Sequence, residues 1–118
     1  LRAILTLGNT FGHAIETAQG YGQWLHGEAV ATGMLLALQM SARRGNIDER
    51  EVQGLREMLR DMHLPTEAPE SMSAEQFIDL MGRDKKVVDG RLRLVLLRGM
   101  GDAVVVDDVT EKELAALL

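Results

Sequence analysis

The segment from Gly27 to Arg44 constrains the fold most, because the helix that it predicts is apolar on every side. A helix of this kind has to be covered by other elements all round. The sequence therefore predicts a helical bundle with this helix at its centre, ended by Gly45-Asn46. The apolar residues of the segment are Ala29, Val30, Ala31, Met34, Leu35, Leu36, Ala37, Leu38 and Met40.

Four shorter helices are expected around the central one. The first runs from Asn9 to Ala18, with Asn9 or Thr10 as N-cap and Gly20 as its end. The other three begin at a Ser, Thr or Asp residue that is followed three positions later by Glu or Gln, a pattern that caps a helix start. These helices cover residues 48–62, 73–81 and 110 onwards, and the proline-containing residues 64–72 form a loop.

A short β-hairpin is expected near the C-terminal end of the chain. Residues 91–98 (RLRLVLLR) begin with strict alternation, and residues 103–106 are mostly β-branched. The segment 99–101 between them (GMG) supplies a turn. The predicted fold class is therefore mainly α, a bundle of about five helices with this hairpin.

The composition excludes several classes of protein. The net charge of −5 argues against a nucleic-acid-binding protein, which needs a basic face. Without cysteine there is neither a disulfide framework nor a thiolate metal site, which fits a cytoplasmic protein. The apolar runs are too short to span a bilayer. Because only 3% of the residues are aromatic, methionines are expected to help fill the core, namely Met34, Met40, Met58 and Met62.

The three histidines differ in their surroundings. His63 ends the helix expected over residues 48–62, where it favours the helix dipole. His13 follows a glycine at a helix start, and His26 directly precedes the central helix. Glycines beside polar residues indicate that something approaches the backbone closely, and a helix N-terminus offers N–H groups to an anion. From the residues alone, a functional site and two ordinary structural histidines both stay open.

Four blocks of sequence carry a family resemblance. Residues 7–16 (LGNTFGHAIE) and 24–31 (WLHGEAVA) are followed by residues 84–87 (DKKV) with 90–93 (GRLR), and finally by residues 101–105 (GDAVV). In this order and spacing they resemble 3-dehydroquinate synthases, whose first block reads LGHTFGHAIE. The resemblance implies that residues 1–118 are part of the helical C-terminal domain and that the N-terminal NAD-binding domain is missing. The start at Leu1, already in structured sequence, agrees with an excerpt from a longer protein.

Enzymes of this family are lyases of the shikimate pathway, which leads to aromatic amino acids. They convert 3-deoxy-D-arabino-heptulosonate 7-phosphate to 3-dehydroquinate and phosphate, with NAD and a divalent metal, zinc or cobalt, as cofactors. The metal polarises the alcohol that is oxidised. The expected partners are this phosphorylated sugar acid, the missing N-terminal domain and a second copy in a homodimer.

Site residues follow from the resemblance position by position. His26 matches a metal ligand, and Asn9 stands in the place of a second histidine ligand. A glutamate, the third ligand, would lie upstream of Leu1. The residues that match contacts to the substrate and its phosphate are Arg2, Thr6, His13, Lys85 and Lys86, although the family normally has asparagine in the place of Thr6.

Simpler interpretations stand beside these roles. Lys85 and Lys86 also fit two solvated lysines before a turn, and Arg2 also fits a surface residue. Glu28 resembles a ligand beside His26, but an acidic residue in the first turn of a helix already stabilises the dipole. Glu16, one turn after His13, is the other carboxylate that could complete a different metal site.

The replacement of histidine by Asn9 predicts weak metal binding, because an amide oxygen is a poor zinc ligand. We therefore expect the isolated chain to be inactive and to bind neither zinc tightly nor NAD. Natural divergence and deliberate alteration both remain open as the origin of Asn9. The alternative function is a non-catalytic helical module that serves packing or partner binding.

Overall fold

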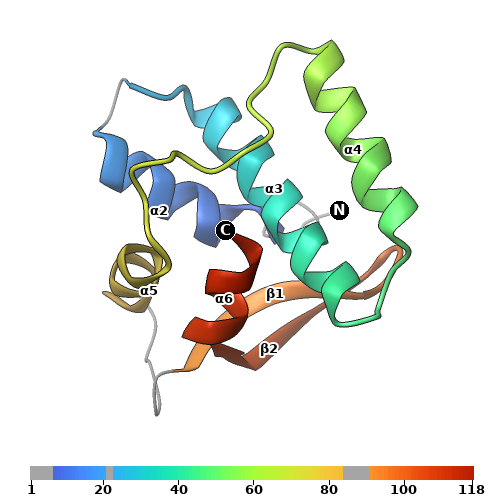
Figure 1. The fold of residues 1–118 in the computed structure, drawn as a ribbon. Helices are drawn as coiled ribbons and strands as arrows, with labels where there is room; N and C mark the ends of the chain where they lie inside the picture. The colour runs from blue at the N-terminus through green and yellow to red at the C-terminus, as the bar shows by residue number, and fades with distance from the viewer. Residues whose placement is uncertain (1–6, 21–22, 84–90) are drawn as a thin grey trace.

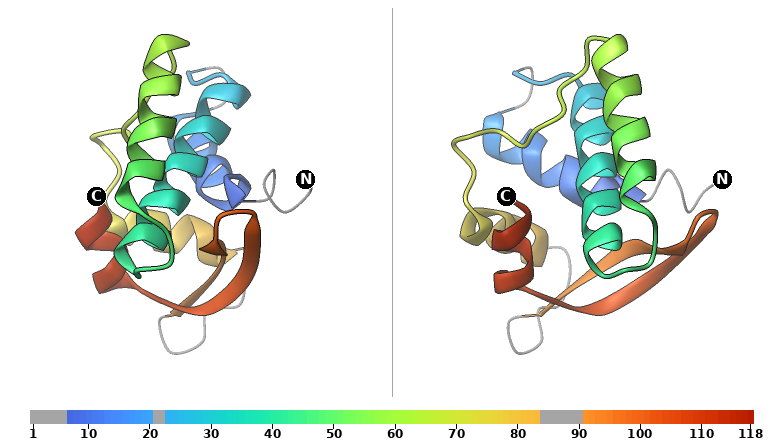
Figure 2. Two further views of the ribbon diagram at one scale, coloured as in Figure 1. Left: turned by 90° about the vertical axis from the view of Figure 1, so that its right-hand side faces the viewer. Right: turned by 45° about the vertical axis from the view of Figure 1, so that its right-hand side comes forward.

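The structure is a computed structural model that describes residues 7–20, 23–83 and 91–118. The central helix of the fold is α3 (His26–Arg43), as the sequence predicted. It contacts α2 (Asn9–Gln19), α4 (Glu49–Asp61), the hairpin and the C-terminal helix α6 (Glu111–Leu117). Figure 1 shows α3 between these elements, and Figure 2 shows α4 running alongside it. The predicted bundle of five helices with a hairpin is confirmed.

Glycines bring α2 and α3 into backbone contact. A Cβ atom on Gly33 would overlap the carbonyl oxygen of Gly8 and would lie 2.8 Å from the nitrogen of Gly12. A Cβ on Gly8 would lie 2.6 Å from the carbonyl oxygen of Val30. The glycines of residues 7–16 predicted that something approaches the backbone closely. At Gly8 and Gly12, it is the backbone of α3 that makes this approach.

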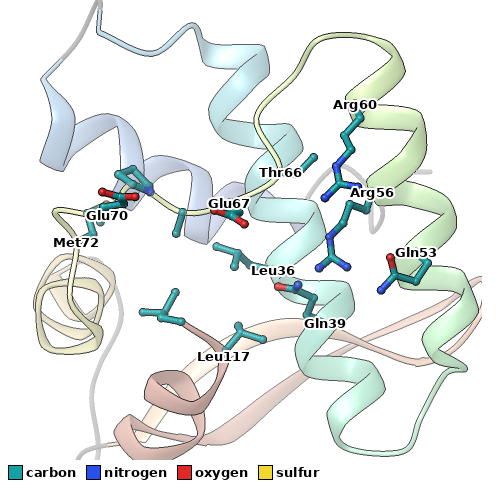
Figure 3. A pocket seen from close by; sticks show the side chains of 13 residues that line it. Leu36, Gln39, Gln53, Arg56, Arg60, Thr66, Glu67, Glu70, Met72 and Leu117 are labelled. Carbon is teal, nitrogen blue, oxygen red and sulfur yellow. The ribbon is translucent and has the colours of Figure 1, made fainter.

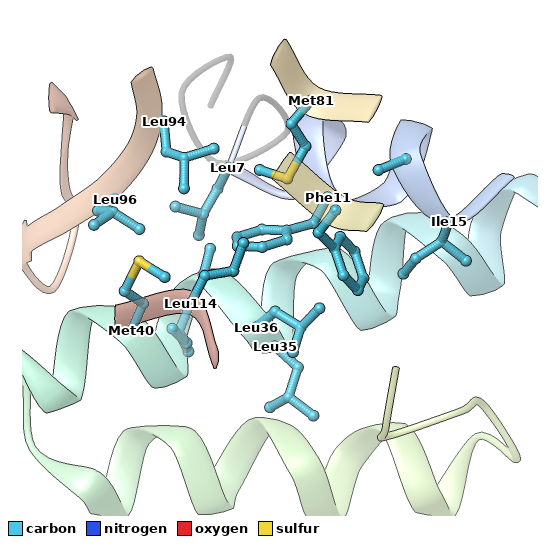
Figure 4. Close-up of a cluster of buried hydrophobic side chains, with 14 of the residues drawn as sticks. Leu7, Phe11, Ile15, Leu35, Leu36, Met40, Met81, Leu94, Leu96 and Leu114 are labelled. Atoms are coloured by element: carbon cyan, nitrogen blue, oxygen red, sulfur yellow. The ribbon is translucent and has the colours of Figure 1, made fainter. Parts of the chain in front are cut away.

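The core lies where α2, α3, α5 (Ala74–Arg83) and β1 (Arg91–Gly99) meet (Figure 4). Phe11 of α2 and Phe77 of α5 pack edge to face, with their ring centroids 6.0 Å apart, and both are buried. Leu114 brings α6 into the same cluster. These aromatic rings and aliphatic side chains join segments that are far apart in the sequence.

The hairpin consists of β1 (Arg91–Gly99) and β2 (Asp102–Thr110), paired antiparallel. Gly101 turns the chain with a φ of 80°, which glycine adopts without strain. The strand β2 continues past Val106, where the sequence prediction ended. Two exposed aspartates, residues poorly suited to strands, precede the buried Val109, which pairs with Leu92. Pairing with β1 and burial of Val109 therefore outweigh the local preference of the aspartates.

The predicted helix starts are confirmed at three positions and wrong at one. Ser73 Oγ accepts a hydrogen bond from the Gln76 N–H, and Thr110 Oγ1 accepts one from Glu113. Asp48 also caps its helix, although its carboxylate accepts from the Arg50 N–H, which lowers the pKa of Asp48. For α2, neither Asn9 nor Thr10 is the N-cap. Gly8 takes that position and has no capping side chain.

The prediction that four methionines fill the core holds only in part. Met40 is fully buried and Met34 is half-buried, but Met58 and Met62 are 57% and 60% exposed. Both lie on or just after α4, which packs against α3 on one side and turns its other sides to solvent. The buried face of this helix therefore consists of Val52 and Leu59, with Leu55 half-buried.

Polar contacts attach the C-terminal end of α3 to the hairpin and to α6. Ser41 Oγ donates to the Ala37 carbonyl at 2.8 Å and accepts from the Leu97 N–H at 2.9 Å, in a buried setting. Arg44 donates two hydrogen bonds to Glu113, at 2.6 and 2.7 Å. The hydrogen bonding to Glu113 raises the pKa of Arg44 further above its already high usual range.

Among the described residues, no helix combines the length and hydropathy that crossing a membrane requires.

Candidate functional site

Three of the residues singled out in the sequence lie on the paired helices α2 and α3. Asn9 is the first residue of α2, His13 follows one turn later, and His26 is the first residue of α3. All three are exposed to solvent. The glycine contacts between α2 and α3 set the spacing of the two helices, and therefore the position of these side chains relative to one another.

A hydrogen bond connects the two helices at this site. His26 Nδ1 lies 2.8 Å from Glu16 Oε1. The side chain of Glu16 is only 13% exposed, whereas that of His26 is 77% exposed. An ionised carboxylate only accepts hydrogen bonds, so Nδ1 donates and carries the proton. In the neutral imidazole, the lone pair is then on Nε2, the ring nitrogen that makes no contact with Glu16.

Glu28 has a structural role. Its Oε1 accepts a hydrogen bond from the Leu25 N–H at 2.8 Å, just before the start of α3. This contact satisfies one of the N–H groups that a helix start leaves without a partner. The interpretation of Glu28 as a first-turn acid is therefore supported by its geometry, and its carboxylate is engaged at the backbone.

His63 stays outside this site. It follows the end of α4 as an exposed residue with a φ of 59°, and its N–H donates to the Arg60 carbonyl. A residue in the left-handed conformation often ends a helix; it is usually glycine, and here His63 takes this place. The structure gives His63 the place at the helix end that the sequence predicted.

Four of the predicted substrate contacts lie outside the described residues. They are Arg2, Thr6, Lys85 and Lys86. The prediction that these residues contact the substrate and its phosphate together with His13 therefore stays a prediction.

The described residues fit a divalent metal in part. Among residues 7–20, 23–83 and 91–118, no group of three His, Asp or Glu side chains is arranged to hold a metal ion. His26 supplies one imidazole nitrogen of the kind that zinc prefers, and Asn9 supplies only an amide. The remaining ligands of a complete site would have to come from outside this part of the chain.

Two cavities lie away from the histidines. The first, of about 560 Å³, opens between α3, α4 and the loop that leads to α5 (Figure 3). Arg56 and Arg60 extend into it from α4, and Glu67 faces them from the loop. The second, of about 400 Å³, is an apolar groove lined mainly by Leu7, Met34, Leu38, Leu55, Met58 and Met100. Neither cavity is lined by Asn9, His13 or His26.

Sequence comparison relates the chain to one family. A family model described as the 3-dehydroquinate synthase C-terminal domain matches residues 1–87. A 3-dehydroquinate synthase of Pseudomonas putida is 56% identical over 118 residues, which is all of this chain and 32% of that protein. The chloroplastic 3-dehydroquinate synthase of Solanum lycopersicum is 53% identical over 115 residues, covering 97% of this chain and 26% of that protein. The chain therefore belongs to the 3-dehydroquinate synthase family and spans about a third of the length of its bacterial relatives.

Solved structures share the fold. A 2-epi-5-epi-valiolone synthase from Streptomyces hygroscopicus, with NAD+ and Zn2+ bound, superposes with a TM-score of 0.79 at 32% identity. The match covers 94% of this chain and 30% of that one. A 2-deoxy-scyllo-inosose synthase, in complex with carbaglucose-6-phosphate, NAD+ and Co2+, gives a TM-score of 0.75 at 25% identity and covers 94% and 31% of the two chains.

Glu16 is the residue whose role the sequence left open. The sequence named it as a fallback ligand because it lies one helical turn from His13, but the structure pairs its carboxylate with His26. The sequence feature that could have indicated this role is that Glu16 is the last residue of the block 7–16, and the next block contains His26. Its partner depends on how α2 packs against α3, which the local pattern does not specify.

Proposed function

We propose that this chain is the C-terminal metal- and substrate-binding part of a 3-dehydroquinate synthase. The complete protein would convert 3-deoxy-D-arabino-heptulosonate 7-phosphate to 3-dehydroquinate and phosphate, as a lyase of the shikimate pathway in the cytoplasm. The observation that carries the proposal is the His26–Glu16 hydrogen bond, since it engages Nδ1 of an otherwise exposed imidazole in a block that matches the family. The NAD-binding domain would lie in the upstream part that the relatives have and this chain does not cover.

Each site residue has a role in this proposal. His26 would hold a divalent metal, zinc or cobalt, and Asn9 would stand at the position of a second ligand. When bound, the metal supplies Lewis-acid polarisation of the alcohol that is oxidised. His13 would bind the substrate and its phosphate together with the other predicted contacts, Arg2, Thr6, Lys85 and Lys86. The NAD+ with zinc or cobalt in the two solved relatives supports this assignment of cofactors.

The isolated chain is expected to be inactive for two reasons. It spans about a third of the length of its bacterial relatives, and the amide of Asn9 would stand in the place of an imidazole ligand. One well-placed imidazole does not hold zinc against water and buffer, because catalytic zinc normally has three protein ligands.

A chimeric enzyme tests the proposal. The upstream part of the Pseudomonas putida relative is joined to this chain, once with Asn9 and once with Asn9→His, and conversion of the sugar phosphate is measured. We expect Asn9→His to raise kcat/KM at least about 100-fold, because Lewis-acid stabilisation contributes several kcal/mol and each 1.36 kcal/mol is tenfold in rate. The Pseudomonas putida enzyme itself serves as the positive control.

Two results of this experiment would contradict the proposal in different ways. Full activity of the chimera that retains Asn9 would show that this position does not limit metal binding. Two folded but inactive chimeras, in the presence of zinc or cobalt, would show that the chain does not complete the active site of this enzyme.

A second candidate function follows from Asn9 itself. A chain that has lost a metal ligand could persist as a non-catalytic helical module for packing or partner binding. Such a module should have its apolar faces covered, by its own residues or by a second copy. Met58, Met62 and Met100 are exposed, and Met58 and Met100 line the apolar groove. This exposed apolar surface favours instead the part of an enzyme that the upstream domain would cover in the complete protein.

The two candidate functions predict different amounts of exposed apolar surface in solution. If the chain is part of an enzyme, the 118-residue chain should bind a dye specific for exposed apolar surface, and the chimera should bind much less. A module that functions alone should bind little dye, either as a monomer or as a stable dimer by sedimentation. Low dye binding by the 118-residue chain would therefore favour the module.

A further inference from the structure

The pairing of α2 with α3 follows a regular register. Gly8 meets α3 at Val30 and Met34, and Gly12 meets it one turn earlier, at Ala29 and Val30. One further turn along α2 is Glu16, and it meets His26 at the beginning of α3. The Glu16–His26 contact is thus the next contact, one helical turn further, in an antiparallel pair of helices whose backbones touch.

This packing limits the freedom of Glu16 more than that of an ordinary surface carboxylate. Its side chain is 13% exposed and lies against the helix pair, whereas the imidazole of His26 stays 77% exposed. The backbone contacts at the glycines set how closely α2 and α3 approach, so the fold sets the position of the carboxylate relative to α3. A long, exposed side chain would not define a partner in this way.

We propose that Glu16 is a positioning residue that holds the imidazole of His26 with its proton on Nδ1. Nε2 then presents its lone pair to a divalent metal. A carboxylate that accepts from the second ring nitrogen of a metal-binding histidine selects the tautomer, orients the ring and makes the ligand more basic. The inference rests on the metal-binding role proposed for His26 and adds the residue that prepares it.

Nitrogen NMR of the imidazole tests the orientation without any metal. The 118-residue chain is labelled with 15N-histidine and measured near pH 8, well above the ordinary pKa of a histidine side chain, about 6.5. His26 is assigned with a His26→Asn variant. The expected spectrum has a protonated Nδ1 and an unprotonated Nε2. In Glu16→Ala the ring should shift towards the other tautomer, and in Glu16→Gln, whose amide oxygen can still accept, it should largely keep the original one.

Matched variants separate positioning from folding. Glu57→Ala removes an exposed carboxylate from α4 and should leave the His26 signals unchanged. Circular dichroism of each variant shows whether the helices persist. A proton on Nε2 of His26 in the unmodified chain, or signals that do not change in Glu16→Ala, would overturn the inference.

Zinc affinity connects the orientation to the proposed site. In the chimera with Asn9→His, Glu16→Ala should weaken zinc binding by about 10- to 100-fold, the usual effect of losing such a partner, and Glu16→Gln should recover part of it. Changed NMR signals with unchanged zinc affinity would refute the positioning role for metal binding. Absence of zinc binding by the chimera with Asn9→His itself would refute the proposed function, while the NMR result would still stand for the orientation of His26.

Discussion

Replacing Phe77 with alanine is expected to lower the free energy of unfolding by about 3–5 kcal/mol, the usual range for removing a buried phenylalanine. Phe77 is fully buried and is the contact of α5 with the ring of Phe11 on α2. The backbone of two packed helices cannot close around the missing ring, so a cavity remains. Since a domain of this size is stable by only about 5–15 kcal/mol, this loss is a large share of the total free energy of unfolding.

Urea denaturation monitored by circular dichroism measures this effect. Met58→Ala is the control, because Met58 is 57% exposed and its loss should change the free energy of unfolding by less than about 0.5 kcal/mol. A double-mutant cycle with Phe11→Ala should give a coupling of about 0.5–1.5 kcal/mol for the edge-to-face pair. A loss below about 1 kcal/mol in Phe77→Ala would mean that α5 does not pack on α2 as the structure has it.

Gly33→Ala is expected to destabilise the protein by about 3 kcal/mol, at the upper end of the usual cost of overpacking. The added methyl group would meet the backbone of Gly8 and Gly12, not the flexible end of a side chain. The only relief is for α2 and α3 to move apart, which loosens every contact along the pair. We expect the Glu16–His26 hydrogen bond to weaken in the same variant.

Gly54→Ala is the matched control for this substitution. Gly54 is an exposed residue inside α4, and a Cβ atom there meets nothing within 4 Å. Alanine favours a helix over glycine, so this variant should gain about 0.5–1 kcal/mol. The same chemical change should thus have opposite signs at the two positions in thermal or urea denaturation. Equal effects would contradict the close contact of the helix backbones.

The local sequence determined most of the secondary structure. The apolar character of the helix at Gly27 to Arg44 on all its sides required a central position, and α3 has it. The caps at Ser73 and Thr110 were readable because a capping bond joins residues only three positions apart. The family was also readable, because its blocks lie in order along the chain.

Several features depended on contacts between distant segments. Val109 extends β2 because Leu92 pairs with it, and Met58 is exposed because nothing described covers that side of α4. The N-cap of α2 is Gly8, where close contact with α3 leaves no space for a capping side chain. A residue's own neighbours in sequence carry none of this information.

The candidate site shows the same division between sequence and structure. The sequence by itself determined that Asn9, Glu16 and His26 are present and that no cysteine is available as a metal ligand. Only the tertiary structure decided that Glu16 pairs with His26 while Glu28 caps the start of α3. The physical reason is that the partner of a side chain across two helices is set by their spacing and register, and here three glycines set both.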